Sequence, residues 1–104
     1  MSQHQSKETL TRLAWLAALR QQGERQCRGM YITHTGQVCA LGMLAEVTGY
    51  QGDWEGYRAL APLAGLSDHH VRSVISMNDG NSITQTRPHT FAEIADVVSS
   101  WFPS

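Results

Sequence analysis

The chain has 104 residues, which is enough for one modest hydrophobic core and too few for two independent ones. Eight basic and nine acidic side chains give a formal net charge of −1, so the overall charge provides no general attraction to nucleic acid or to an anionic membrane. Two cysteines are too few for a disulfide scaffold, residues 1–9 contain no apolar signal-peptide segment, and no apolar run approaches the roughly 20 residues that span a bilayer. We therefore expect a single cytoplasmic domain over residues 1–104, with residues 1–6 as a flexible N-terminus.

The first predicted element is a helix that begins near Lys7, where Ser6 can cap it, and ends before Gly23. Its apolar residues recur at spacings of three and four, which is the period of a helix with one broad buried face. These residues are Leu10, Leu13, Ala14, Leu16, Ala17, Ala18 and Leu19.

Residues 29–40 place β-branched and aromatic side chains on either side of Gly36, which readily adopts a positive φ, and this predicts a short β-hairpin. Residues 42–47 then predict a brief helix closed by Gly49. Residues 60–64, interrupted by a proline, predict one further helical turn.

Two capped helices are predicted in the last third of the chain. Ser67 can cap a helix that runs to about Met77, and Thr90 with Glu93 forms a capping box before a terminal helix. Together the elements predict an α+β fold, mostly helical, with about four helices and one short β-hairpin. The residues expected in its core are Leu13, Leu16, Leu41, Leu44, Val74, Ile75, Phe91, Ile94 and Val98.

Three short motifs carry a resemblance: "CALGML" at residues 39–44, "ISMNDG" at 75–80 and "HTFAEIADVV" at 89–98. In this order and spacing, over about residues 15–98, the chain resembles a widespread group of small, functionally uncharacterised bacterial and phage proteins. The resemblance implies their fold and a bacterial, phage or mobile-element origin, and it brings no activity. Residues 81–88 form a longer loop than that group leads us to expect.

Cys39 lies where the hairpin is expected to meet a helix. A thiolate at a helix N-terminus is stabilised by the helix dipole, which would suit a hydrolase or transferase that uses Cys39 as nucleophile, with His89 as base and Asp79 to orient it. The alternative is that Cys39, within the apolar run at residues 38–41, is a small buried residue. The burial preference of cysteine favours this second interpretation.

No metal site or cofactor site is predicted. Cys27 and Cys39 are not arranged as a zinc knuckle, and the adjacent His69 and His70 would point about 100° apart on a helix. The last two helices resemble the opening of a helix-turn-helix motif, but no basic recognition helix follows them, so nucleic-acid binding is disfavoured.

Two loops are candidates for a binding surface. Asn78 and Asp79 can form a local Asx turn, or they can line a small polar pocket with Arg87. The glycine-rich loop before residue 60 combines aromatic rings, which could anchor a partner or cover the core, with acidic groups that would select a basic partner site. Its candidate residues are Tyr50, Asp53, Trp54, Glu55 and Tyr57.

The sequence as a whole favours a small binding protein over an enzyme. We expect it to engage another protein, as phage or mobile-element anti-defence inhibitors such as anti-CRISPR proteins do, and this last step is an analogy. The two alternatives are the enzyme that uses Cys39 and a small-ligand binder at the Trp54 and Asp79 loops.

Overall fold

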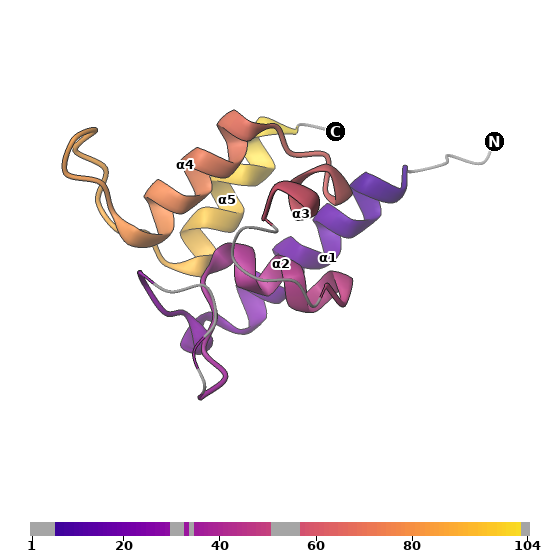
Figure 1. Cartoon of the computed structure of the whole chain (residues 1–104), viewed down its shortest axis with the longest axis horizontal. Helices are drawn as coiled ribbons and strands as arrows, with labels where there is room; N and C mark the ends of the chain where they lie inside the picture. Colours follow the sequence, from indigo (N-terminus) through magenta and orange to yellow (C-terminus); the bar gives the residue numbers. More distant parts are fainter. Residues whose placement is uncertain (1–5, 30–32, 34, 51–56, 103–104) are drawn as a thin grey trace.

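The computed structural model describes residues 6–29, 33, 35–50 and 57–102. Its helices are α1 (Lys7–Gln21), the 3-10 turn η1 (Gly23–Arg25), α2 (Ala40–Thr48), α3 (Tyr57–Leu63), α4 (Asp68–Asp79) and α5 (Phe91–Trp101). α1 packs against α5 and α2, and α4 lies beside α5 (Figure 1). The described part of the chain is therefore mostly helical, as the sequence predicts.

The helix boundaries follow from the predicted caps. Ser6 Oγ accepts a hydrogen bond from the Thr9 N–H at 3.1 Å, and α2 ends at Gly49, whose φ of 74° is left-handed. Ser67 and His70 form a capping box at the start of α4. Thr90 and Glu93 form the predicted capping box of α5.

The buried core contains seven of the nine residues expected there. Ile75 is only half-buried, and Leu13 is 46% exposed, so the prediction for Leu13 is wrong. The face that α1 buries is centred on Trp15 and Leu19, and at about 100° per residue Leu13 lies well to one side of it. Trp15 is fully buried and donates its Nε1–H to the Ala40 carbonyl at 2.8 Å, which fixes that face against α2.

The predicted β-hairpin is not confirmed, because the described residues contain only isolated bridges between single residue pairs. Gln26 and Val38 form a parallel bridge, in which the Cys27 N–H donates to the Val38 carbonyl at 2.9 Å and closes a loop. The expected turn is present, since Gly36 has a φ of 88°. Residues 30–32 and 34, which carry much of the expected pairing, lie outside the described residues.

The loop between α4 and α5, residues 80–88, projects from one end of the molecule (Figure 1). Asn81 and Thr86 pair through two backbone hydrogen bonds of 2.8 and 2.9 Å, and the His89 N–H donates to the Met77 carbonyl at 2.5 Å. Gly80 has a φ of 80°, and a Cβ there would come within 2.9 Å of Pro88. The stem of this 80–88 loop is therefore held by its own contacts, and it requires glycine at residue 80.

None of the described helices is both long and apolar enough to span a membrane.

Candidate functional site

Cys39 is the N-cap of α2, and its thiol is buried. Its Sγ accepts a hydrogen bond from the Gly42 N–H at 3.3 Å, and only 7% of the residue is exposed. Burial raises the pKa of this thiol to about 11, although the N–H groups of Gly42 and Leu41 act in the opposite direction. Desolvation therefore outweighs the helix N-terminus, and the thiol is protonated at neutral pH.

A buried amide joins the segments around Cys39. Asn78, which is 2% exposed, accepts hydrogen bonds on Oδ1 from the Ala40 N–H and from Gln26 Nε2, both at 3.1 Å. Its Nδ2 donates to the Cys27 carbonyl at 2.9 Å and to Asp79 Oδ1 at 2.8 Å. All four hydrogen-bonding positions of the amide are used inside the protein, so Asn78 does not line a binding surface.

The other candidate catalytic side chains are also engaged elsewhere. Asp79 Oδ1 accepts a hydrogen bond from the Gly29 N–H at 2.9 Å, and His89 Nδ1 lies 2.8 Å from the Arg87 carbonyl. No hydrogen bond among the described residues connects Cys39 Sγ to either side chain. Cys39, His89 and Asp79 are thus on neighbouring elements without forming a nucleophile–base pair.

Arg87 forms an ion pair with Glu93 rather than with Asp79. Its two terminal nitrogens lie 3.3 and 2.5 Å from the Glu93 carboxylate oxygens. Arg87 and the Thr90 N–H together lower the pKa of Glu93 to about 2. The pair extends the capping box of α5, and Arg87 does not form the predicted polar pocket with Asp79.

The glycine-rich loop lies almost entirely outside the described residues. Asp53, Trp54 and Glu55 are among residues 51–56, and Tyr57 opens α3 without a described side chain. Tyr50 is half-buried and packs against the core. The role of these rings as partner anchors therefore stays a prediction.

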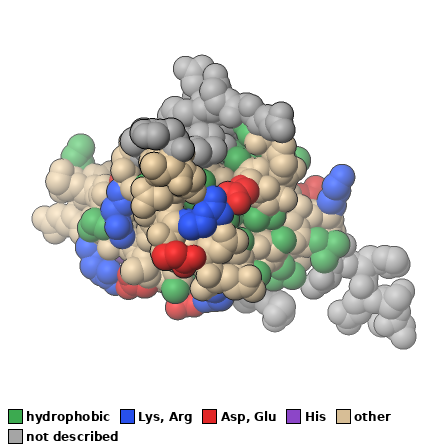
Figure 2. Space-filling model, turned by 90° about the horizontal axis from the view of Figure 1, so that it is seen from below, with side chains coloured by type: hydrophobic (Ala, Val, Ile, Leu, Met, Phe, Trp, Pro, Cys, Tyr) green, Lys and Arg blue, Asp and Glu red, His purple; other side chains and the backbone are tan. Residues whose placement is uncertain are grey.

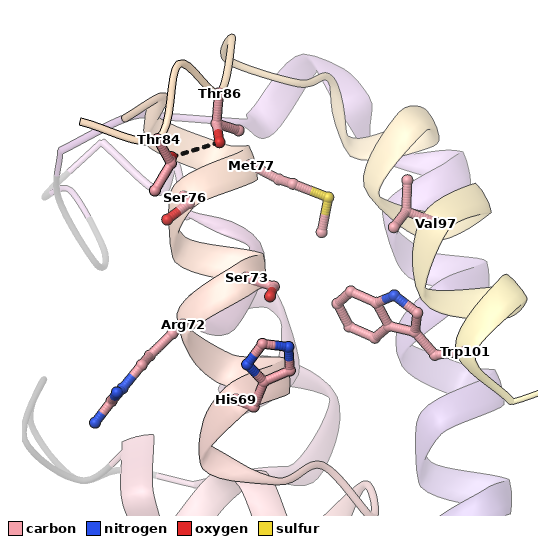
Figure 3. Close-up of a pocket in the computed structure, with 9 residues that line it drawn as sticks. All are labelled: His69, Arg72, Ser73, Ser76, Met77, Thr84, Thr86, Val97 and Trp101. Carbon is pink, nitrogen blue, oxygen red and sulfur yellow. Dashed lines mark hydrogen bonds between the residues drawn. The ribbon is translucent and has the colours of Figure 1, made fainter. Parts of the chain in front are cut away.

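A groove that the sequence analysis did not identify lies between α4, α5 and the 80–88 loop (Figure 3). It has a volume of about 410 Å³. Its floor is apolar, with Met77 and Trp101 pointing toward one another and Val97 beside them. The residues that line this α4–α5 groove are His69, Arg72, Ser73, Ser76, Met77, Thr84, Thr86, Val97 and Trp101.

The sequence contained one signal for this surface, the single large aliphatic residue in an otherwise polar loop. Ile83 is 92% exposed on the 80–88 loop, the largest exposure of any described bulky apolar residue. The groove itself could not be found from periodicity, because Val97 and Trp101 fall on or beside the apolar face that α5 turns to the core.

Charged and metal-ligating groups form no further site in the described part of the chain. No three His, Cys, Asp or Glu side chains there gather where they could hold a metal ion. On the face in Figure 2, basic and acidic side chains are interspersed, and no patch of one sign is visible on it.

In comparisons with known proteins, no family model, no curated protein and no solved structure matches the chain.

Proposed function

We propose that the chain is a small binding protein that engages another protein, with the α4–α5 groove and the 80–88 loop as its contact surface. The observation that carries this proposal is the exposure of Ile83 beside a groove with an apolar floor. Single exposed apolar residues are common on protein surfaces, so Ile83 alone would mean little. With an exposed aliphatic side chain next to an apolar groove, a partner can bury Ile83 in its own surface and insert an apolar side chain into the groove.

The construction of the loop supports the same proposal. Asn81 Oδ1 accepts hydrogen bonds from the N–H groups of Ile83 and Thr84 at 2.9 and 3.3 Å, in addition to the backbone pairing of Asn81 with Thr86. A loop that is ordered before binding loses less conformational entropy when a partner docks. Ile83 is thereby presented on a preorganised support.

The proposed setting is the cytoplasm of a bacterium, as the resemblance inferred from the sequence at residues 39–44, 75–80 and 89–98 implies. An anti-defence inhibitor would act by occupying the surface of a host protein, which requires a contact surface and no catalytic group. This part of the proposal rests on the analogy with anti-CRISPR proteins.

The two rival functions have less support. A cysteine-dependent enzyme would need an ionisable thiol and a base, whereas the pKa of Cys39 is raised and the ring of His89 contacts a carbonyl. A small-ligand site at Asp79 would compete with the hydrogen bonds that its carboxylate receives from Gly29 and Asn78.

Site-specific photo-crosslinking in a bacterial lysate tests the contact surface. A photoreactive amino acid placed at Ile83 should give a defined adduct with one protein. The same group placed at Leu10, which is 53% exposed on α1, is the matched control and should not give this adduct. The adduct should disappear when Ser73→Trp fills the groove. An adduct that forms equally from residue 10, or that survives Ser73→Trp, would contradict this placement of the interface.

A further inference from the structure

Arg72 differs from the other described arginines in having no hydrogen-bond or ion-pair partner within the described part of the chain. Arg20, Arg25 and Arg87 form ion pairs with carboxylates. Arg12 and Arg28 donate to backbone carbonyls, and the side chain of Arg58 lies outside the described part of the chain. Arg72 is exposed on α4 at the rim of the groove, where none of its five guanidinium donors bonds to a described residue.

The groove around Arg72 contains no negative charge among the described residues that line it. His69 and Arg72 are the titratable side chains that line it, and the rest of the rim consists of serine and threonine hydroxyls. In Figure 3 the side chain of Arg72 extends outward from α4, away from Trp101. It therefore suits an anionic group at the mouth of the groove, while the floor suits an apolar group.

The apolar floor of the groove is held in place by contacts on the far side of Trp101. The indole of Trp101 stacks on the ring of His70 with centroids 4.8 Å apart and planes inclined by 15°. His70 is in turn fixed as part of the α4 capping box, where its Nδ1 accepts from the Ser67 N–H at 3.1 Å. A supported aromatic face beside Met77 is well suited to a bulky apolar side chain.

On these grounds, and resting on the proposed function, we propose that the occupant of the groove is an acidic, apolar segment of the partner protein: a bulky apolar side chain lies on Met77, Val97 and Trp101, and a neighbouring aspartate or glutamate pairs with Arg72. A nucleic acid is the less favoured occupant. Its phosphates would need several cations in a row, whereas the groove offers one arginine and the chain carries a net charge of −1.

Selection from a random peptide library displayed on phage tests this inference with the full chain. Peptides selected on the native protein should be enriched in Asp or Glu next to Leu, Ile, Phe or Trp. A peptide from this set should bind Arg72→Glu about three- to tenfold more weakly than the native protein. Lys7→Glu, an equal charge change on an exposed residue of α1, is the matched control and should leave binding unchanged.

The outcomes separate the two proposals. Selected peptides that bind Ser73→Trp as tightly as the native protein would overturn both the groove as the site and the inference about its occupant. Groove-dependent peptides without an excess of acidic residues, or with an affinity that Arg72→Glu does not change, would overturn only the acidic occupant. Oligothymidylate that displaces the peptides with higher affinity would also overturn it, in favour of nucleic acid. Circular dichroism of each variant verifies that it is folded.

Discussion

At the scale of single residues, Asn78 is the one buried polar side chain among the described residues, and its amide connects α2, α4 and the loop after η1. From the sequence, an asparagine before Asp79 at a helix end is typical of a local Asx turn. The sequence therefore singles out Asn78, but the Asx turn that it predicts gives Asn78 the wrong hydrogen-bond partners. Three of its four bonds are to groups at least 38 positions away, and no local pattern encodes such pairs.

Replacing Asn78 with alanine should destabilise the fold, because it removes the hydrogen bonds that the side chain forms with the buried Ala40 N–H and with the Cys27 carbonyl. The free energy of unfolding should fall by about 1–3 kcal/mol, measured by urea denaturation. Gln21→Ala, which removes an exposed amide at the end of α1, should change it by less than about 0.5 kcal/mol. Equal stabilities for the two variants would show that the buried network contributes nothing.

The thiol of Cys39 should react slowly with iodoacetamide in the native protein at pH 7.5. With a pKa of about 11, only on the order of one thiol in 10³–10⁴ is ionised there, and the atom is also buried. Mass spectrometry should find Cys39 labelled more slowly than the half-buried Cys27, with the difference lost in denaturant. We also expect Cys39→Ala to leave partner binding intact. Rapid native labelling of Cys39 would make the cysteine-dependent enzyme the leading hypothesis.

At the scale of elements, the caps made the helix ends predictable, whereas the buried faces depended on tertiary packing. Ser67 and the Thr90–Glu93 pair act within one turn of chain, so the local sequence is sufficient to locate the starts of α4 and α5. α1 is different, because leucines and alanines occupy most of its circumference. Its inward face is selected by the bond from Trp15 to Ala40, which links positions 25 apart.

A pair of identical substitutions checks this assignment of faces. Leu44→Ala removes a fully buried side chain of α2 and should lower the free energy of unfolding by about 2–5 kcal/mol. Leu13→Ala, at 46% exposure on α1, should lower it by less than about 1 kcal/mol. Thermal or urea denaturation measures both values. A large loss from Leu13→Ala would mean that α1 presents a different face to the core.

At the scale of the whole molecule, His70 connects three helices at the end opposite the 80–88 loop. Its ring stacks on Trp101 and meets Phe102 edge-on at 5.1 Å, and the guanidinium of Arg12 from α1 lies 3.8 Å from the Phe102 ring centre.

The α4–α5 groove could not be predicted from the sequence, because it too depends on tertiary packing. It exists only once α4, α5 and the 80–88 loop are placed together, and each of its residues is unremarkable within its own segment.

Lowering the pH should destabilise the contacts that His70 makes with Trp101 and Phe102. Burial lowers the pKa of His70, and the nearby positive charges of His69 and Arg12 lower it further. The unfolded chain, with the ordinary value of 6.5, then binds the proton more readily than the folded one. The stability contributed by neutral His70 is therefore present above pH 6.5 and is lost as the pH falls through its lowered pKa.

Melting temperatures measured between pH 7.5 and 5.0 test this dependence. The native protein should lose stability toward the acidic end, and His70→Gln should lose less over the same range. His69→Gln removes one of the two nearby charges that lower the pKa of His70, so it should lose slightly less stability than the native protein but more than His70→Gln. A pH profile that is identical for all three proteins would count against His70 as the source of the dependence.

Because the stem of the 80–88 loop is closed, selection for stability and selection for partner recognition can act on different residues of this protein. Because Asn81 pairs with Thr86 and the His89 N–H reaches Met77, the residues between them carry little of the free energy of folding. Residues 82–85 are all exposed, so changes among most of them are nearly neutral for stability while they alter the shape offered to a partner. A lineage could thus change the protein it recognises by altering four positions, and the helical scaffold would remain the same through the change.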